Sequence, residues 1–149
     1  MHIIILRGES GSGKTTTLQM VYTVLKRLNA TVICEPVYIK ENSKRDFRAK
    51  LSFQNKTVAI FTEGDLQNGC VDAIKEYEES GDVDILIMAH TSNLLPLEGS
   101  QAVASHTTIT VKKTVPPNKF EEMSSHIGDC LNIIINILMS DTVKTNKPA

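Results

Sequence analysis

The stretch "IIILRGESGSGKTTTLQMVYTVLKRL" (residues 3–28) decides the fold of this chain of 149 residues. It begins within a continuous apolar run, "HIIIL" (2–6), which predicts a strand buried on both faces of a parallel sheet. Apolar residues then recur at helical spacing, which predicts an amphipathic helix over about 14–29: Leu18, Val21, Tyr22, Leu25 and Leu28. A glycine-rich segment joins the strand to the helix.

That joining segment, "GESGSGKT" (8–15), matches GxxxxGK[ST], the phosphate-binding P-loop or Walker A motif. Backbone N–H groups of such a loop, together with the positive end of the following helix, converge on a phosphate. Lys14 is expected between the β- and γ-phosphates as a catalytic residue, Thr15 on Mg²⁺, and Thr16 at the α-phosphate. The predicted nucleotide-binding residues are Gly8, Glu9, Ser10, Gly11, Ser12, Gly13, Lys14, Thr15 and Thr16.

Strands and helices alternate along the rest of the chain. A second strand is expected over 30–34, ended by Glu35 and Pro36, and a polar loop over 40–45. Residues 46–53 alternate in polarity and precede the apolar run 57–61, which predicts an antiparallel hairpin. A helix over 68–80, a buried strand over 84–89, an irregular segment over 91–105 and an edge strand over 107–111 follow.

The last helix is marked by Asn118 as its cap and Glu121 at the capping-box position. Its expected core stripe comprises Phe120, Met123, Ile127, Cys130, Ile134 and Ile137. The sequence thus predicts a three-layer α/β/α fold with a mostly parallel sheet of the P-loop NTPase type and an antiparallel hairpin at about 46–62. We expect one domain over 1–140 and a polar, flexible tail over 141–149.

Bulk composition limits the classes of partner. The net charge of −1 provides no basic field for nucleic acid or an anionic membrane, and no apolar run is long enough to span a bilayer. An odd number of widely spaced cysteines, Cys34, Cys70 and Cys130, predicts reduced and buried thiols. These features favour a cytoplasmic protein whose partners are a nucleotide and either a small-molecule substrate or another protein.

The P-loop, with a buried strand before it and a helix after it, resembles the P-loop NTPase superfamily. The resemblance implies that ATP, or another nucleoside triphosphate, binds together with Mg²⁺. The layout of "DFRAKLSFQNKTVAIFTEGD" (46–65) followed by "DILIMAH" (84–90) is similar to that of small bacterial ATP-binding P-loop proteins.

A P-loop usually works with an acidic residue at the end of another strand. The strand 57–61 ends in Thr62, Glu63, Gly64 and Asp65, so Glu63 and Asp65 are candidate catalytic acids and Asp65 a candidate magnesium ligand. The alternative is a solvated turn with two acids. His90 also ends a strand, but a structural role is favoured for it, and His126 has no chemical context in the sequence.

The segment "LEGSQ" (97–101) is similar to the LSGGQ signature of transporter-type ATPases. In those proteins the signature precedes a helix and then an apolar strand that ends in Asp-Glu. Here "AVASHTTITVKKT" follows, without an acidic pair, and the chain is short. The sequence therefore argues against membership of that family.

Three functions are compatible with these features. ATP binding with weak or partner-dependent hydrolysis is favoured, a small-molecule kinase is the second candidate, and a non-enzymatic nucleotide-binding module is the third. A kinase of this size usually has arginines in a lid, whereas residues 91–105 contain none and Glu98 is their only charged residue.

Overall fold

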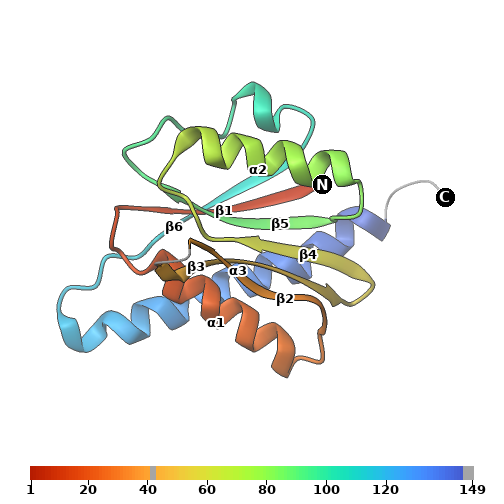
Figure 1. Cartoon of the computed structure of the whole chain (residues 1–149). Helices are drawn as coiled ribbons and strands as arrows, with labels where there is room; N and C mark the ends of the chain where they lie inside the picture. Colours follow the sequence, from red (N-terminus) through yellow and green to blue (C-terminus); the bar gives the residue numbers. More distant parts are fainter. Residues whose placement is uncertain (41–42, 146–149) are drawn as a thin grey trace.

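The structure is a computed structural model that describes residues 1–40 and 43–145, and Figure 1 shows its arrangement. The strands of the sheet are β1 (His2–Gly8), β2 (Thr31–Lys40), β3 (Ser43–Phe53), β4 (Lys56–Phe61), β5 (Ile85–Thr91) and β6 (Thr107–Lys112). The α-helices are α1 (Lys14–Arg27), α2 (Gln67–Ser80) and α3 (Glu122–Thr145), and the short 3-10 helices are η1 (Gln101–Val103) and η2 (Lys119–Glu121).

The six strands form one mixed sheet in the order β2-β3-β4-β5-β1-β6. β1 pairs in parallel with β5 and β6, and β4 pairs in parallel with β5, whereas β3 is antiparallel to both β2 and β4. Helices α1 and α3 cover one face of the sheet and α2 covers the other (Figure 1). The predicted three-layer α/β/α fold with an antiparallel segment is confirmed.

β1 shows how the sequence specifies this burial. Ile4 and Leu6 pack toward α1 and α3, while Ile3 and Ile5 pack toward α2. All four side chains are at most 2% exposed. An unbroken apolar run is therefore required, because both faces of a central parallel strand are covered by helices.

The hairpin predicted over 46–62 is confirmed, since Arg48 pairs with Phe61 and Phe53 with Lys56. The predicted end of the second strand, at Glu35 and Pro36, was wrong. β2 continues through both residues to Lys40 and forms a second antiparallel pair with β3. The register shifts between Cys34 and Val37, and β2 is an edge strand, where proline is tolerated. The expected loop over 40–45 was also wrong for the described residues, because Lys40 ends β2 and residues 43–45 begin β3; residues 41–42 lie outside the described residues.

The expected core stripe of the last helix was only partly right. Asn118 caps η2 by accepting a hydrogen bond from the Glu121 N–H, and α3 begins after it. Cys130, Ile134 and Ile137 are buried as expected, and Ile133 joins them. The other three predicted core residues are exposed: Phe120, Met123 and Ile127. The apolar arc of α3 is wider than the face that contacts the sheet, so helical periodicity alone did not identify the buried part.

The structure also bears on the predictions for the cysteines and for membrane-spanning segments. Cys70 and Cys130 are buried free thiols, but Cys34 is exposed on β2, contrary to the prediction. Within the described residues, no helix is both long and apolar enough to cross a bilayer. Helix α3 extends to Thr145, and the final residues of the predicted tail, 146–149, lie outside the described residues.

Candidate nucleotide-binding site

The site lies where four parallel strands end together. β1, β4, β5 and β6 run in the same direction, so their carboxyl ends share one edge of the sheet. The P-loop leaves β1 at Gly8, which pairs with Thr91 at the end of β5. Ligands of open α/β sheets bind beyond this edge, and the glycine loop therefore occupies the expected position.

The loop closes around the Lys14 side chain. Its Nζ donates hydrogen bonds to the carbonyl of Gly8 at 3.1 Å and to that of Glu9 at 2.6 Å. Burial lowers the pKa of Lys14, opposed by the negative charges of Asp65 and then Asp46, while the charge of Lys113 lowers it further. Lys14 begins α1, whose first-turn N–H groups have no partners within the helix. An ammonium and a helix N-terminus thus point to the same anion site.

Gly13 makes the entry into α1 possible. Its φ of 93° lies in the left-handed region, where a side chain is strained. A Cβ at this position would also collide with the imidazole ring of His126 on α3, because this Cβ would lie 2.8 Å from the ring's Nε2. His126 is 3% exposed, and its Nδ1 has no hydrogen-bond partner among the described residues. No role for His126 was predictable from sequence, because the residue is more than a hundred positions from the loop that it contacts.

Asp65 lies beside the loop, as sequence reasoning expected. Its Oδ1 accepts a 2.6 Å hydrogen bond from Thr91 Oγ1 at the end of β5. Gly64 permits this approach, because a Cβ there would collide with the backbone of Ala89 and lie 2.7 Å from the His90 nitrogen. Burial, followed by the charges of Asp65 and Glu63, raises the pKa of Cys70 to about 12. The turn after β4 therefore concentrates negative charge at this edge.

A second acid, Asp46, was missed by sequence reasoning. Thr15 Oγ1 and Thr62 Oγ1 each donate a 3.1 Å hydrogen bond to Asp46 Oδ1. The antiparallel pairing of β3 with β4 places the start of β3 beside the end of β4, which brings Asp46 to the same edge. The predicted hairpin contained this signal, because the antiparallel partner of the strand 57–61 has to begin where that strand ends.

The donor set at this edge fits Mg²⁺. Oxygen atoms of Thr15, Thr62 and Asp46 converge, and Asp65 lies close enough to affect the pKa of Lys14. Magnesium prefers oxygen ligands and usually takes one or two carboxylates together with phosphate oxygens. Among the described residues there is no group of three or more His, Cys, Asp or Glu side chains that would hold a metal ion by itself. The arrangement suits a metal that arrives with its nucleotide.

A buried ion pair lies next to the start of the loop, where a Cβ on Gly8 would stand 2.6 Å from the Cβ of Lys113. Lys113, which follows β6, donates from Nζ to Asp129 Oδ2 on α3 at 2.8 Å. Thr114 donates to the same carboxylate from its backbone N–H at 2.9 Å and from its hydroxyl at 2.6 Å. Both charged side chains are almost fully buried. Sequence reasoning missed this pair, since each residue alone reads as an ordinary surface charge.

The remaining candidates have structural partners. His90 is fully buried, and its Nε2 donates to the Gln67 side-chain carbonyl at 3.0 Å. Burial lowers the pKa of His90, as do the charges of Arg7 and Lys14. Glu35, where the second strand was expected to end, accepts a hydrogen bond from the Tyr22 hydroxyl at 3.3 Å.

The comparisons with known proteins give one match. The family model described as ABC transporter matches residues 1–138. No curated protein and no solved structure matches the chain.

The match overturns the expectation, drawn from residues 97–101, that the chain lies outside this family. That expectation required an acidic pair on the strand after the segment. In the structure the segment leads through η1 into β6, and the candidate acids Glu63 and Asp65 follow the end of β4, earlier in the chain. Parallel strands bring their ends to one edge whatever their order in sequence, so chain order was a poor guide. The chain belongs to the ABC transporter family, as an ATPase domain of the P-loop NTPase superfamily, and this membership implies that it binds and hydrolyses ATP.

Proposed function

We propose that the chain binds Mg²⁺-ATP at the P-loop and hydrolyses it slowly alone and faster with a protein partner. The observation that carries this proposal is the Lys14 ammonium, which lies inside the loop with the carbonyls of Gly8 and Glu9 as its hydrogen-bond partners. A phosphate group entering the loop offers a charged acceptor in place of two neutral ones, so the ammonium gains a direct attraction between opposite charges in addition to its hydrogen bond.

The other roles follow from position. Backbone N–H groups of residues 8–16 cradle the phosphates, and Thr15 and Asp65 hold Mg²⁺, which neutralises developing charge on the phosphates during transfer. Asp46 orients the Thr15 hydroxyl through their 3.1 Å hydrogen bond. Glu63, in the turn that holds Asp65, is the candidate for orienting the attacking water.

The charged side chains at this edge already have hydrogen-bond partners within the chain, which supports hydrolysis that depends on a protein partner. Asp65 accepts from Thr91, and Asp46 accepts from Thr15 and Thr62. Arg7 lies near the end of β1, at the same edge of the sheet. Its side chain donates to the carbonyls of Ser92 at 3.0 Å and Leu94 at 2.7 Å. Residues 91–105 supply no arginine, so a positive charge for the transition state has to come from elsewhere. ATP as substrate also supports the expected cytoplasmic location.

Phosphate release from ATP, measured with and without Mg²⁺, tests the proposal. Wild type is expected to release phosphate slowly, and Lys14→Ala to fold but to lose both the release and the nucleotide-induced rise in melting temperature. A nucleotide at about 100 times its dissociation constant adds about 2.7 kcal/mol of stability, which a melting curve detects easily. Lys26→Ala is the matched control, because Lys26 lies exposed on the same helix over the Tyr22 ring.

Three outcomes would contradict parts of the proposal. An unchanged nucleotide shift in Lys14→Ala would place the phosphate site elsewhere. Binding without release, under all conditions and with added cell extract, would favour a nucleotide-binding regulatory module. Transfer of the γ-phosphate to a small-molecule acceptor instead of water would favour the kinase alternative.

A further inference from the structure

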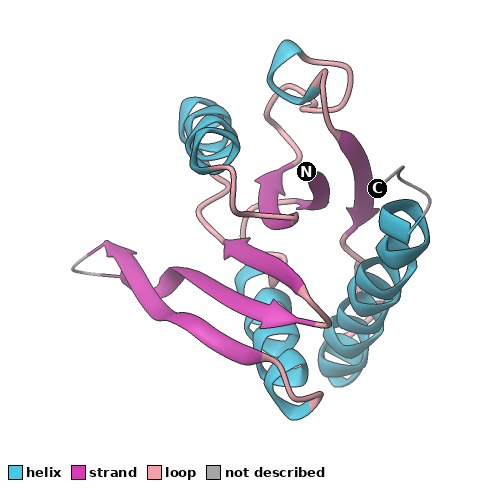
Figure 2. Cartoon of the chain, turned by 90° about the vertical axis from the view of Figure 1, so that its right-hand side faces the viewer, coloured by secondary structure: helices cyan, strands magenta, loops and turns pink. Residues whose placement is uncertain are grey.

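Helix α3 has a second apolar stripe that faces solvent. Its buried side packs on the sheet and on α1, and Figure 2 shows α3 and α1 side by side at the edge of the molecule. The exposed side carries Met123 (55% exposed), Ile127 (48%), Leu131 (51%), Ile135 (54%), Leu138 (41%) and Met139 (64%). A surface helix of a monomeric protein normally carries polar residues on this side.

Five of the six residues of this stripe form a row whose order is symmetric, and Leu138 lies beside that row. At four-residue steps it reads Met, Ile, Leu, Ile, Met, with Leu131 at the centre: Met123, Ile127, Leu131, Ile135 and Met139. A two-fold axis through Leu131 that reverses the helix direction places Ile127 opposite Ile135 of the second copy. An isologous interface requires this kind of self-complementarity, because the same surface serves both subunits. A row of residues four apart is also the ridge that helices use when they pack against each other.

The stripe lacks charge along its whole length. Between residues 123 and 140 the only Asp, Glu, Lys or Arg is Asp129, and its carboxylate is buried against Lys113. Depletion of charge marks the centre of protein–protein interfaces, and homodimer interfaces are the more apolar class. An anionic membrane surface would instead favour a basic flank, which this segment of α3 does not have.

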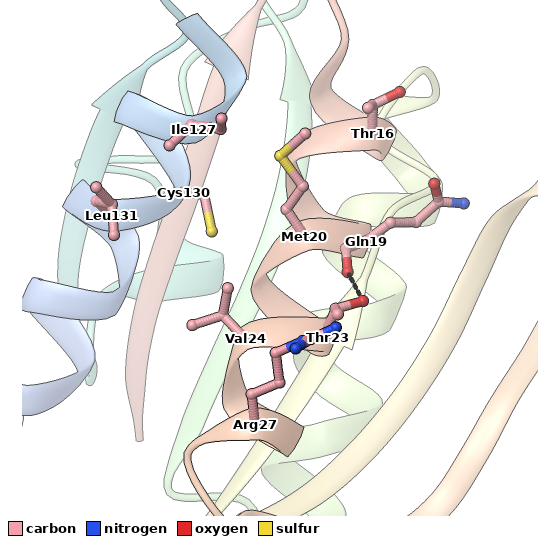
Figure 3. Close-up of a pocket in the computed structure, with 9 residues that line it drawn as sticks. All are labelled: Thr16, Gln19, Met20, Thr23, Val24, Arg27, Ile127, Cys130 and Leu131. Atoms are coloured by element: carbon pink, nitrogen blue, oxygen red, sulfur yellow. Dashed lines mark hydrogen bonds between the residues drawn. The ribbon is translucent and has the colours of Figure 1, made fainter. Parts of the chain in front are cut away.

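A groove beside the stripe provides a place for inserted side chains. It lies between α1 and α3 and has a volume of about 470 Å³, and Figure 3 shows the side chains that line it from the two helices. Met20 and Val24 line it from α1, and Ile127, Cys130 and Leu131 line it from α3. Ile127 and Leu131 belong to both the stripe and the groove. Side chains of the stripe on one molecule can therefore insert into the groove beside the stripe of a second molecule.

The size of this surface suits a dimer. A helix of 24 residues and a neighbouring helix of 14 residues, each about 10 Å wide, present roughly 600 Å² in projection. Specific interfaces begin at about 600 Å² per partner. We propose that two copies of this chain associate through α3, antiparallel, with Leu131 on the two-fold axis and its neighbours inserted beside α1 of the partner.

Sedimentation of the full chain over a range of concentrations tests the proposal. Wild type is expected to sediment as a dimer, and Leu131→Asp as a monomer, because the substitution places two carboxylates at the axis. The dissociation constant should rise at least about 100-fold. Leu95→Asp is the matched control, because Leu95 is 76% exposed in the loop after β5, away from α3. A monomeric wild type would overturn the proposal and leave the stripe to another partner.

A charge exchange tests the antiparallel arrangement. Ile127→Lys alone and Ile135→Glu alone should each weaken association. The double variant should recover dimerisation, because each lysine then faces a glutamate of the other copy. In a parallel pair, like charges would face each other and the double variant would be weaker than either single one. Circular dichroism checks that all three remain folded, and failure of the double variant to recover would overturn the proposed pairing.

Discussion

His126 on α3 lies against Gly13 of the P-loop, so closely that a Cβ on Gly13 would stand 2.8 Å from the imidazole Nε2. The contact joins the C-terminal helix to the first turn of α1, at the position where the loop passes through a φ of 93°. The conformation of the phosphate-binding loop is thus restricted both by its own backbone and by a side chain from the other end of the chain.

Gly13→Ala is expected to destabilise the protein for two separable reasons. The left-handed backbone costs about 1–2 kcal/mol for a residue with a Cβ, and the collision with His126 adds to it. His126→Ala removes the collision, so the double variant should lose less stability than the sum of the two single variants. Urea unfolding of all four proteins measures the coupling. Additivity within about 0.5 kcal/mol would show that the ring moves aside without cost.

Asp65→Asn is expected to separate metal-dependent from metal-independent binding. The substitution keeps the shape and removes the charge, so ATP binding without Mg²⁺ should persist while most of the extra affinity given by Mg²⁺ is lost, and hydrolysis with it. Calorimetric titration with ATP at several Mg²⁺ concentrations measures this.

Glu63→Gln and Asp46→Asn are the matched comparisons for Asp65. Glu63→Gln shares the turn and the charge change, and should bind Mg²⁺-ATP like wild type but hydrolyse it more slowly. Asp46→Asn should weaken the contact with Thr15. If Asp46→Asn loses the magnesium effect while Asp65→Asn keeps it, Asp46 holds the metal. If none of the three matters, the acid comes from another strand.

Asp129→Asn is expected to cost about 3–5 kcal/mol, because it leaves the Lys113 ammonium buried without a counter-charge. Burial raises the pKa of Asp129, but hydrogen bonds from Lys113 and Thr114 outweigh it and hold the pKa below its usual range. The stability from this group is therefore present above the ordinary Asp pKa of about 4 and is lost as the pH falls through the lower native pKa.

The pH profile of unfolding identifies this contribution. Asp129→Asn should show a smaller loss of stability on acidification than wild type. Asp82→Asn removes an exposed partner of Lys50 and serves as the control, with a much smaller effect at neutral pH. Equal effects of the two substitutions at neutral pH would contradict the prediction.

His90 is expected to make the protein less stable on mild acidification. Its native pKa is lowered, chiefly by burial, so the unfolded chain binds this proton at a higher pH than the native protein. Stability is then complete above the unfolded pKa of about 6.5 and declines as the pH falls toward the native pKa. Urea unfolding at several pH values between 5 and 8 measures the slope, and His90→Gln should flatten it. An unchanged slope would assign the dependence to other histidines.

The sequence by itself determined the alternation of elements and the position of the P-loop between the first strand and the first helix. A buried strand, a glycine loop and a helix are local features, and "HIIIL", "GESGSGKT" and the apolar residues of α1 encode each of them within a few turns of chain. The hairpin of β3 and β4 was predictable for the same reason, because alternation and a short turn are both local. The position of Asp65 followed from the rule that parallel strands end at one edge.

Only the tertiary structure decided which distant residues complete the site. Asp46, His126 and the Lys113–Asp129 pair reach the loop through sheet order and helix packing, which local patterns do not encode. The same holds for α3: its apolar residues extend around more of the helix than the sheet and α1 cover, so periodicity predicted a helix but not its buried side. Burial depends on what lies opposite a residue in space, and that is settled only when the elements are assembled.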